Sequence, residues 1–148
     1  VTRRTNAIAT VYHTDSRYAI FPPIDGVITS PPYVGLIDYH EQHAYAYHLL
    51  SLEDNREGEI GSAANGSSQK ARQQYQTDIA HVLKRALAAM PPGGRLIIIA
   101  GDRYRLYGEI ASMISVQAEG IVQRHVNRRT GRRASEFYES AFIWRKPS

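Results

Sequence analysis

The chain has 148 residues, and its 18 Lys and Arg against 14 Asp and Glu give it a formal charge of +4. With 43% apolar and 22% charged residues it has the composition of a folded globular protein of about one domain. The longest strongly apolar run, Leu96 to Ala100, is far shorter than the ~20 residues of a membrane span, so we expect no membrane segment. The absence of cysteine excludes disulfides, thiolate metal sites and a cysteine nucleophile, and we expect a cytoplasmic protein.

Two short apolar runs near the start predict buried strands. Ala7 to Tyr12 is rich in β-prone residues and is followed by turn residues. Asp25 to Thr29 is the second run, and a Ser-Pro-Pro sequence ends it. Further on, Tyr39 to Leu50 has the spacing of a helix. The Gly-, Ser- and Asn-rich stretch that follows, within residues 51–70, predicts a flexible insertion.

The second half of the chain alternates helices and strands. Apolar side chains recur at three- and four-residue steps between Gln69 and Met90, which indicates a helix with one apolar face. The later elements are a strand at Arg95 to Ala100, a helix at Tyr107 to Val116, and strands at Gly120 to Arg128 and Phe137 to Arg145. This order predicts an α/β fold in a single domain over residues 1–148. Its sheet is expected to be mostly parallel, with an antiparallel hairpin at the C-terminal end.

The most informative segment is Ser30-Pro31-Pro32-Tyr33, which directly follows the second predicted strand. In open α/β sheets, ligands bind at the carboxyl ends of the strands. Each proline fixes its own φ near about −65° and restricts the residue before it, so the loop is stiff and its carbonyls lack local amide partners. Rigid acceptors beside an aromatic ring suit recognition of a flat group that bears an exocyclic amine.

This tetrapeptide resembles motif IV of the amino-group DNA methyltransferases, which use S-adenosylmethionine. The Ser form, preceded by Thr as here, is most similar to the cytosine-N4 enzymes. The similarity extends to several further segments, namely Tyr12 to Arg17 (the motif III turn), Leu36 to Tyr39, Pro92 to Ile99, Gly101-Asp102 and Phe137 to Lys146. The resemblance therefore implies the Rossmann-like sheet of a class I methyltransferase, of which this chain holds a part.

The resemblance also implies the catalytic roles. Ser30, Pro31, Pro32 and Tyr33 form the catalytic loop. The Ser30 hydroxyl and the Pro31 carbonyl would accept hydrogen bonds from the target amine, and Tyr33 would stack on the base. A target in duplex DNA must first be flipped out of the helix.

Cofactor and DNA contacts are implied at other positions. Asp15, Ser16 and Thr29 would hold S-adenosylmethionine, with helix capping as an equal alternative for Asp15. The predicted helix and the residue before it would line the substrate cleft with Asp38, Tyr39 and His43. No metal site is expected, because the HEQH sequence here lacks the HExxH spacing. A basic cluster would bind DNA phosphates, or else form a solvated hairpin, and it comprises Arg124, Arg128, Arg129, Arg132 and Arg133.

The sequence contains no counterpart of the Gly-rich cofactor motif of these enzymes, nor of the first two strands of their sheet. Three explanations stay open. The chain is a fragment of a longer protein, with the missing part before Val1 or after Ser148. It is a natural remnant, or half of a split enzyme that a second chain completes. Or it is complete and holds the cofactor in another way.

Two classes of function follow. The first is transfer of a methyl group from S-adenosylmethionine to an exocyclic amine of a DNA base, with cytosine N4 favoured over adenine N6. Methylation of RNA or of a protein glutamine is a more distant variant. The second class is a non-catalytic remnant that binds nucleic acid or a partner chain. The remnant predicts salt-sensitive DNA binding without cofactor binding.

Overall fold

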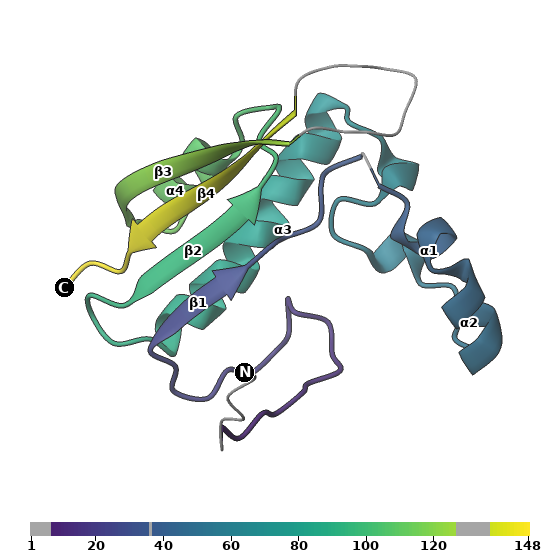
Figure 1. Cartoon of the computed structure of the whole chain (residues 1–148), viewed down its shortest axis with the longest axis horizontal. Helices are drawn as coiled ribbons and strands as arrows, with labels where there is room; N and C mark the ends of the chain where they lie inside the picture. Colours follow the sequence, from purple (N-terminus) through teal and green to yellow (C-terminus); the bar gives the residue numbers. More distant parts are fainter. Residues whose placement is uncertain (1–6, 36, 127–136) are drawn as a thin grey trace, which may run out of the picture.

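The computed structural model describes residues 7–35, 37–126 and 137–148 (Figure 1). Its strands are β1 (Gly26–Thr29), β2 (Arg95–Ala100), β3 (Gln117–Val126) and β4 (Phe137–Arg145). Its α-helices are α1 (Tyr39–Gln42), α2 (Ala44–Leu50), α3 (Gln69–Ala88) and α4 (Tyr107–Met113). Two short 3-10 helices, η1 (Arg56–Gly58) and η2 (Ala63–Asn65), lie in the connection to α3. No helix in the described ranges is long and apolar enough to cross a membrane.

The strands form one sheet in the order β1-β2-β4-β3. β1 and β2 pair in parallel, whereas β4 pairs antiparallel with both β2 and β3. The α/β class and the C-terminal antiparallel pair are thus confirmed. A mostly parallel sheet is not confirmed, because among the described strands two of the three pairings are antiparallel. The cause is that β3 and β4 run in opposite directions and β4, rather than β3, lies against β2.

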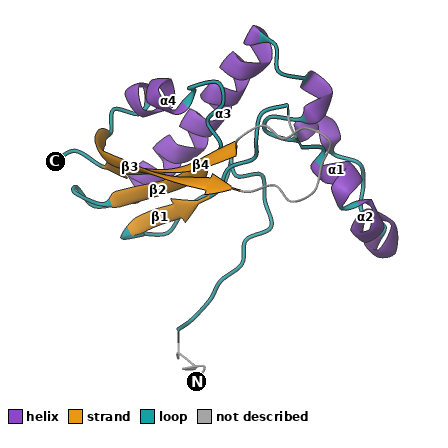
Figure 2. Cartoon of the chain, turned by 45° about the horizontal axis from the view of Figure 1, so that its top comes forward, coloured by secondary structure: helices purple, strands orange, loops and turns teal. Residues whose placement is uncertain are grey.

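One face of the sheet is covered by α3 and α4 (Figures 1 and 2). The alternation along β2 turns Leu96, Ile98 and Ala100 towards these helices, and all three are buried. They pair in register with the buried β4 residues Trp144, Phe142 and Ser140. From α3, the buried side chains are Tyr75, Ile79, Ala80, Leu83, Ala86 and Leu87. The predicted apolar face of the long helix is therefore confirmed as the core of the protein.

Two expected elements differ in the structure. The predicted strand at Ala7 to Tyr12 is wrong, because this segment is an exposed, irregular stretch that runs away from the sheet (Figure 2). Its Ile8 and Val11 side chains are 96% and 91% exposed. A β-prone run becomes a strand only when a neighbouring strand pairs with its backbone. The predicted helix from Tyr39 to Leu50 is divided at His43, which caps both α1 and α2.

Three segments of the chain meet at one edge of the sheet. Because β1 and β2 are parallel, their carboxyl ends meet at the same edge, and antiparallel β4 begins there. The Ser30–Tyr33 loop, the Gly101-Asp102 turn and Glu139 of β4 therefore converge. Both views place α1 and α2 beyond this edge, away from the sheet (Figures 1 and 2).

Candidate functional site

The prolines restrict the backbone of the Ser30–Tyr33 loop, and the side chain of Ser30 is exposed to solvent. Pro31 is buried, whereas Ser30 is exposed. Within the described residues, no group forms a hydrogen bond with the Ser30 hydroxyl. The Pro32 carbonyl accepts a hydrogen bond of 2.8 Å from the Tyr75 hydroxyl of α3, a partner that is neither local in sequence nor an amide. The exposed serine hydroxyl is therefore free to meet a ligand, while the loop behind it is anchored.

Tyr33 is held at its hydroxyl end by a residue near the start of β4. Its hydroxyl donates to Glu139 Oε1 at 3.2 Å, and the other Glu139 oxygen accepts from Arg124 Nη2 at 2.6 Å. Burial raises the pKa of Tyr33, and the negative charge of Glu139 raises it further. The phenol therefore remains protonated and keeps its role as donor. Of the predicted basic cluster, Arg124 is thus linked to the Ser30–Tyr33 loop through Glu139.

Behind the loop lies a pair of tyrosines that the sequence analysis missed. Tyr75 and Tyr107 are 3% and 2% exposed, and their hydroxyl oxygens are 2.7 Å apart. Burial raises the pKa of Tyr75 to about 12 and that of Tyr107 as well. In sequence, Tyr75 is one more large residue on the apolar face of a helix. The sequence does contain one indication of its role: a tyrosine on the buried face of a helix has a hydroxyl that needs a hydrogen-bond partner.

Asp102 lies in the turn that follows β2, at the same edge of the sheet. Its carboxylate accepts from the Leu106 amide at 2.6 Å and from the Tyr107 amide at 3.3 Å. It therefore satisfies free amides at the start of α4 and fixes the position of Tyr107. Its charge also raises the pKa of both buried tyrosines.

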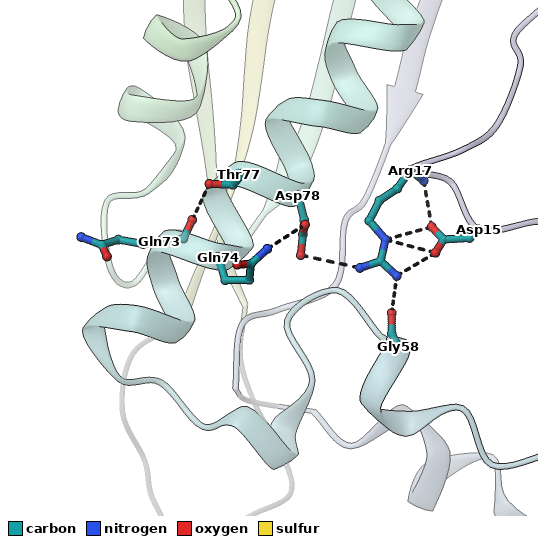
Figure 3. Close-up of polar contacts among 7 residues, drawn as sticks. All are labelled: Asp15, Arg17, Gly58, Gln73, Gln74, Thr77 and Asp78. Carbon is teal, nitrogen blue, oxygen red and sulfur yellow. Dashed lines mark hydrogen bonds and ion pairs between the residues drawn. The ribbon is translucent and has the colours of Figure 1, made fainter.

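The residues predicted to hold the cofactor are only partly available. Asp15 forms an ion pair with Arg17, with 2.7 Å between Oδ2 and Nη2 (Figure 3). Asp15 Oδ1 also accepts from the Arg17 amide at 2.9 Å, which makes a turn and not a helix cap. The hydrogen bond from the Arg17 side chain lowers the pKa of Asp15. Ser16 is exposed, and Thr29 is half-buried in β1.

Arg17 joins three segments of the chain. Besides Asp15, its Nη2 donates to the Gly58 carbonyl at 2.7 Å, and its Nη1 lies 3.8 Å from Asp78 Oδ2 on α3 (Figure 3). The turn at residues 15–18 is therefore tied to the 57–68 segment and to α3. No sequence pattern predicts these contacts, because they join residues 41 and 61 positions apart.

A cavity of about 450 Å³ lies between α3 and the 57–68 segment. Val34 and Tyr75 line the cavity, and Tyr75 connects it to the Ser30–Tyr33 loop. Its other lining residues include charged side chains of both signs, namely Arg17, Glu57, Glu59, Lys70 and Asp78. Burial raises the pKa of Glu59. Ser62 is 2% exposed, so this segment, predicted as flexible, packs against the domain.

The predicted DNA contacts are placed as follows. Asp38 Oδ1 accepts from the Glu41 amide at 2.8 Å and caps α1, so part of its carboxylate is already used. Tyr39 is half-buried and His43 is exposed. The remaining arginines of the basic cluster, Arg128, Arg129, Arg132 and Arg133, lie outside the described residues. Among the described residues, no group of three His, Asp or Glu side chains is arranged to hold a metal ion.

The Ser-Pro-Pro-Tyr loop thus lies at the carboxyl ends of the parallel strands of an α/β sheet. No model of a known protein family matches the sequence. Over 119 residues the chain is 41% identical to the type II methyltransferase M.MjaII of Methanocaldococcus jannaschii. The match covers 80% of this chain and 22% of that relative, so the chain spans less than a quarter of its length. This identity confirms the predicted resemblance to the DNA methyltransferases.

Solved structures show the same fold. A candidate DNA modification methylase from Thermus thermophilus superposes with a TM-score of 0.55 at 17% identity, over 91% of this chain and 52% of that one. The same protein in complex with S-adenosyl-L-methionine also gives a TM-score of 0.55, at 18% identity, over 90% of this chain and 54% of that one. At such identities the similarity concerns the fold.

Proposed function

We propose that this chain forms part of the catalytic region of a DNA methyltransferase, which transfers a methyl group from S-adenosylmethionine to the exocyclic amine of a base. The observation that carries the proposal is the anchored Ser30–Tyr33 loop, whose serine is exposed at the edge where β1 and β2 end. The identity of 41% to a type II methyltransferase supports it.

The loop supplies what an exocyclic amine needs in order to react. The lone pair of such an amine is delocalised into the ring, so the nitrogen is a poor nucleophile. Hydrogen bonds from its N–H groups to the Ser30 hydroxyl oxygen and the Pro31 carbonyl favour a more pyramidal nitrogen. Tyr33 stacks on the base and, with its hydroxyl bonded to Glu139, presents the ring in one orientation.

S-adenosylmethionine supplies the electrophilic methyl group. Of the residues expected to hold it, the exposed Ser16 hydroxyl fits a polar ligand, and Thr29 lies at the end of β1 next to the loop. Asp15 fits less well, because Arg17 already donates to both of its oxygens. A contact between Asp15 and the cofactor therefore requires the arginine to share or release the carboxylate.

Cytosine N4 is the favoured target, and adenine N6 is the alternative. Digestion of DNA to nucleosides after incubation with the chain and labelled S-adenosylmethionine separates them. The proposal predicts labelled N4-methylcytosine. Label in N6-methyladenine alone would overturn the cytosine assignment, and a folded chain that labels neither nucleoside would contradict methyl transfer by this chain.

The second candidate is a non-catalytic remnant that binds DNA or a partner chain. It is favoured by the Asp15 carboxylate, both of whose oxygens already accept from Arg17. Calorimetric titrations with S-adenosylmethionine and with duplex DNA at two salt concentrations distinguish the two. Cofactor binding supports the enzyme. Salt-sensitive DNA binding without cofactor binding supports the remnant.

A further inference from the structure

The buried tyrosine pair and the catalytic loop form one continuous set of hydrogen bonds. The Tyr75 hydroxyl of α3 lies 2.8 Å from the Pro32 carbonyl oxygen and 2.7 Å from the Tyr107 hydroxyl of α4. Both phenols are buried in the core, where the Tyr107 ring stacks on Phe142 at 4.9 Å between centroids. The loop is thereby connected to the two helices that cover the sheet.

These hydrogen bonds can run in only one direction. A phenol has one hydroxyl hydrogen, and a carbonyl oxygen can only accept. The Tyr75 hydrogen is therefore directed to Pro32, so Tyr107 must be the donor in the bond between the two hydroxyls. Each donor polarises the next one in such a chain, and the bond to Pro32 is strengthened as a result.

The bond to Pro32 fixes the torsion that the prolines leave free. The rings of Pro31 and Pro32 restrict φ at both residues, and each also limits ψ of the residue before it. The ψ angle of Pro32 remains, and this angle sets the direction of its carbonyl and of the peptide plane that leads to Tyr33. A donor held rigidly in the core selects one value of that angle.

We propose that Tyr75 and Tyr107 are positioning residues of the methyl-transfer loop, which set the peptide plane between Pro32 and Tyr33 and thereby the orientation of the Tyr33 ring. This inference rests on the proposed function. The Tyr33 ring is then held from two sides, by its backbone through Tyr75 and by its hydroxyl through Glu139. Because the pKa of Tyr75 is raised to about 12, its hydroxyl remains a donor throughout the neutral range.

Phenylalanine substitutions test the role with little change in packing. Tyr75→Phe removes the donor to Pro32, and Tyr107→Phe removes only the bond that supports it. We expect the methyl-transfer rate constant to fall about 10- to 100-fold in Tyr75→Phe and several-fold in Tyr107→Phe, with the KM for S-adenosylmethionine unchanged. The double variant should be no slower than Tyr75→Phe, because both residues act through one bond.

Tyr104→Phe is the matched control. Tyr104 is half-buried and lies between the Gly101-Asp102 turn and α4, and no described residue forms a hydrogen bond with its hydroxyl. Its variant should transfer methyl groups at the wild-type rate. A Tyr75→Phe protein that keeps the wild-type rate constant would overturn the proposal. The proposal would also be overturned if the rate constant and the KM for S-adenosylmethionine changed by the same factor in Tyr75→Phe, because that result indicates a general loss of structure.

A second measurement separates this inference from the proposed function. The Pro32 carbonyl carbon is observed through the Tyr33 amide in a triple-resonance NMR spectrum of the labelled chain. Its resonance should shift in Tyr75→Phe and stay in place in Tyr104→Phe. If the wild-type chain transfers no methyl group, the proposed function fails. In that case an unshifted Pro32 resonance in Tyr75→Phe also refutes the positioning role.

Discussion

Tyr33 is held at both its backbone and its hydroxyl. Its backbone follows the Pro32 carbonyl, which accepts from Tyr75, and its hydroxyl donates to Glu139. Its ring is therefore presented as a fixed surface. Tyr33→Phe removes one hydrogen bond and should slow methyl transfer by at most about tenfold. Tyr33→Ala also removes the stacking surface, worth about 1–3 kcal/mol per base, and should slow transfer about 10- to 100-fold or more.

Single-turnover kinetics with labelled S-adenosylmethionine measure both variants of Tyr33. Tyr18→Ala is the control, since the Tyr18 side chain is 72% exposed and has no assigned role. Wild-type rates in Tyr33→Ala would remove Tyr33 from the site.

The buried phenol of Tyr75 makes stability depend on alkaline pH. Its pKa is raised from 10.0 to about 12, so the folded state holds its proton more tightly than the unfolded state does. This contribution is complete below pH 10 and is lost as the pH rises towards 12, by about 3 kcal/mol at 1.4 kcal/mol per unit. Urea unfolding at pH 9 and pH 12 should show a smaller loss in Tyr75→Phe than in wild type. An identical loss in both would contradict the assignment.

Arg17 joins the turn at residue 15, the Gly58 carbonyl and Asp78. Arg17→Met should cost about 1–3 kcal/mol of unfolding free energy, because the Gly58 carbonyl loses a charged donor. Lys84→Met on the exposed side of α3 is the matched control and should change little. The pKa of Asp15 is lowered in the folded state, so its ion pair stabilises the fold at pH values above the ordinary pKa of an aspartate. This stabilisation is lost as the pH falls and the carboxylate is protonated. Equal denaturation midpoints for the two variants would refute the role of Arg17.

Gly35, two residues after the Ser30–Tyr33 loop, contacts the 57–68 segment. Its φ is +61°, its amide donates to the Gly61 carbonyl at 3.0 Å, and a Cβ there would collide with the Gly66 backbone. Gly35→Ala should therefore destabilise the protein by about 1–3 kcal/mol and separate the two segments. Gly108→Ala in α4, where a Cβ meets open space, should be neutral or stabilising by up to about 1 kcal/mol. Chemical denaturation compares them, and a neutral Gly35→Ala would disprove the contact.

The elements that the sequence predicted correctly are those whose residue pattern lies within one short segment of the chain. The apolar face of α3 and the short apolar run of β2 each lie within one stretch of sequence, and the structure contains both elements. Ala7 to Tyr12 has a strand composition but no pairing partner in the structure, and a composition cannot report a missing neighbour. The contacts of the site are equally non-local. Tyr75 lies 43 positions from Pro32, and Tyr33 lies 106 positions from Glu139.

At the scale of the whole molecule, α3 and α4 cover one face of the sheet, and no helix among the described residues covers the other. Ile28, Ile97 and Ile143 share a register row on the face opposite α3 and α4, and Ile28 is 76% exposed at the β1 edge. The strand order that creates this surface was not predictable, because a parallel or antiparallel pairing depends on which strands become neighbours. The position of the Ser30–Tyr33 loop at the carboxyl end of a strand was predictable, since the strand and the Ser-Pro-Pro sequence that ends it are consecutive in the chain.

The central claim is that the Ser30–Tyr33 loop transfers methyl groups, and the most direct test is the transfer rate of Ser30→Ala. This change removes the exposed hydroxyl that we propose accepts from the target amine, and it leaves the bond between Tyr75 and Pro32 in place. Ser112→Ala, on the exposed side of α4, is the control. The account predicts labelled DNA with the wild-type chain and the control, and a rate lower by about 100-fold with Ser30→Ala. Equal rates for Ser30→Ala and wild type would contradict it.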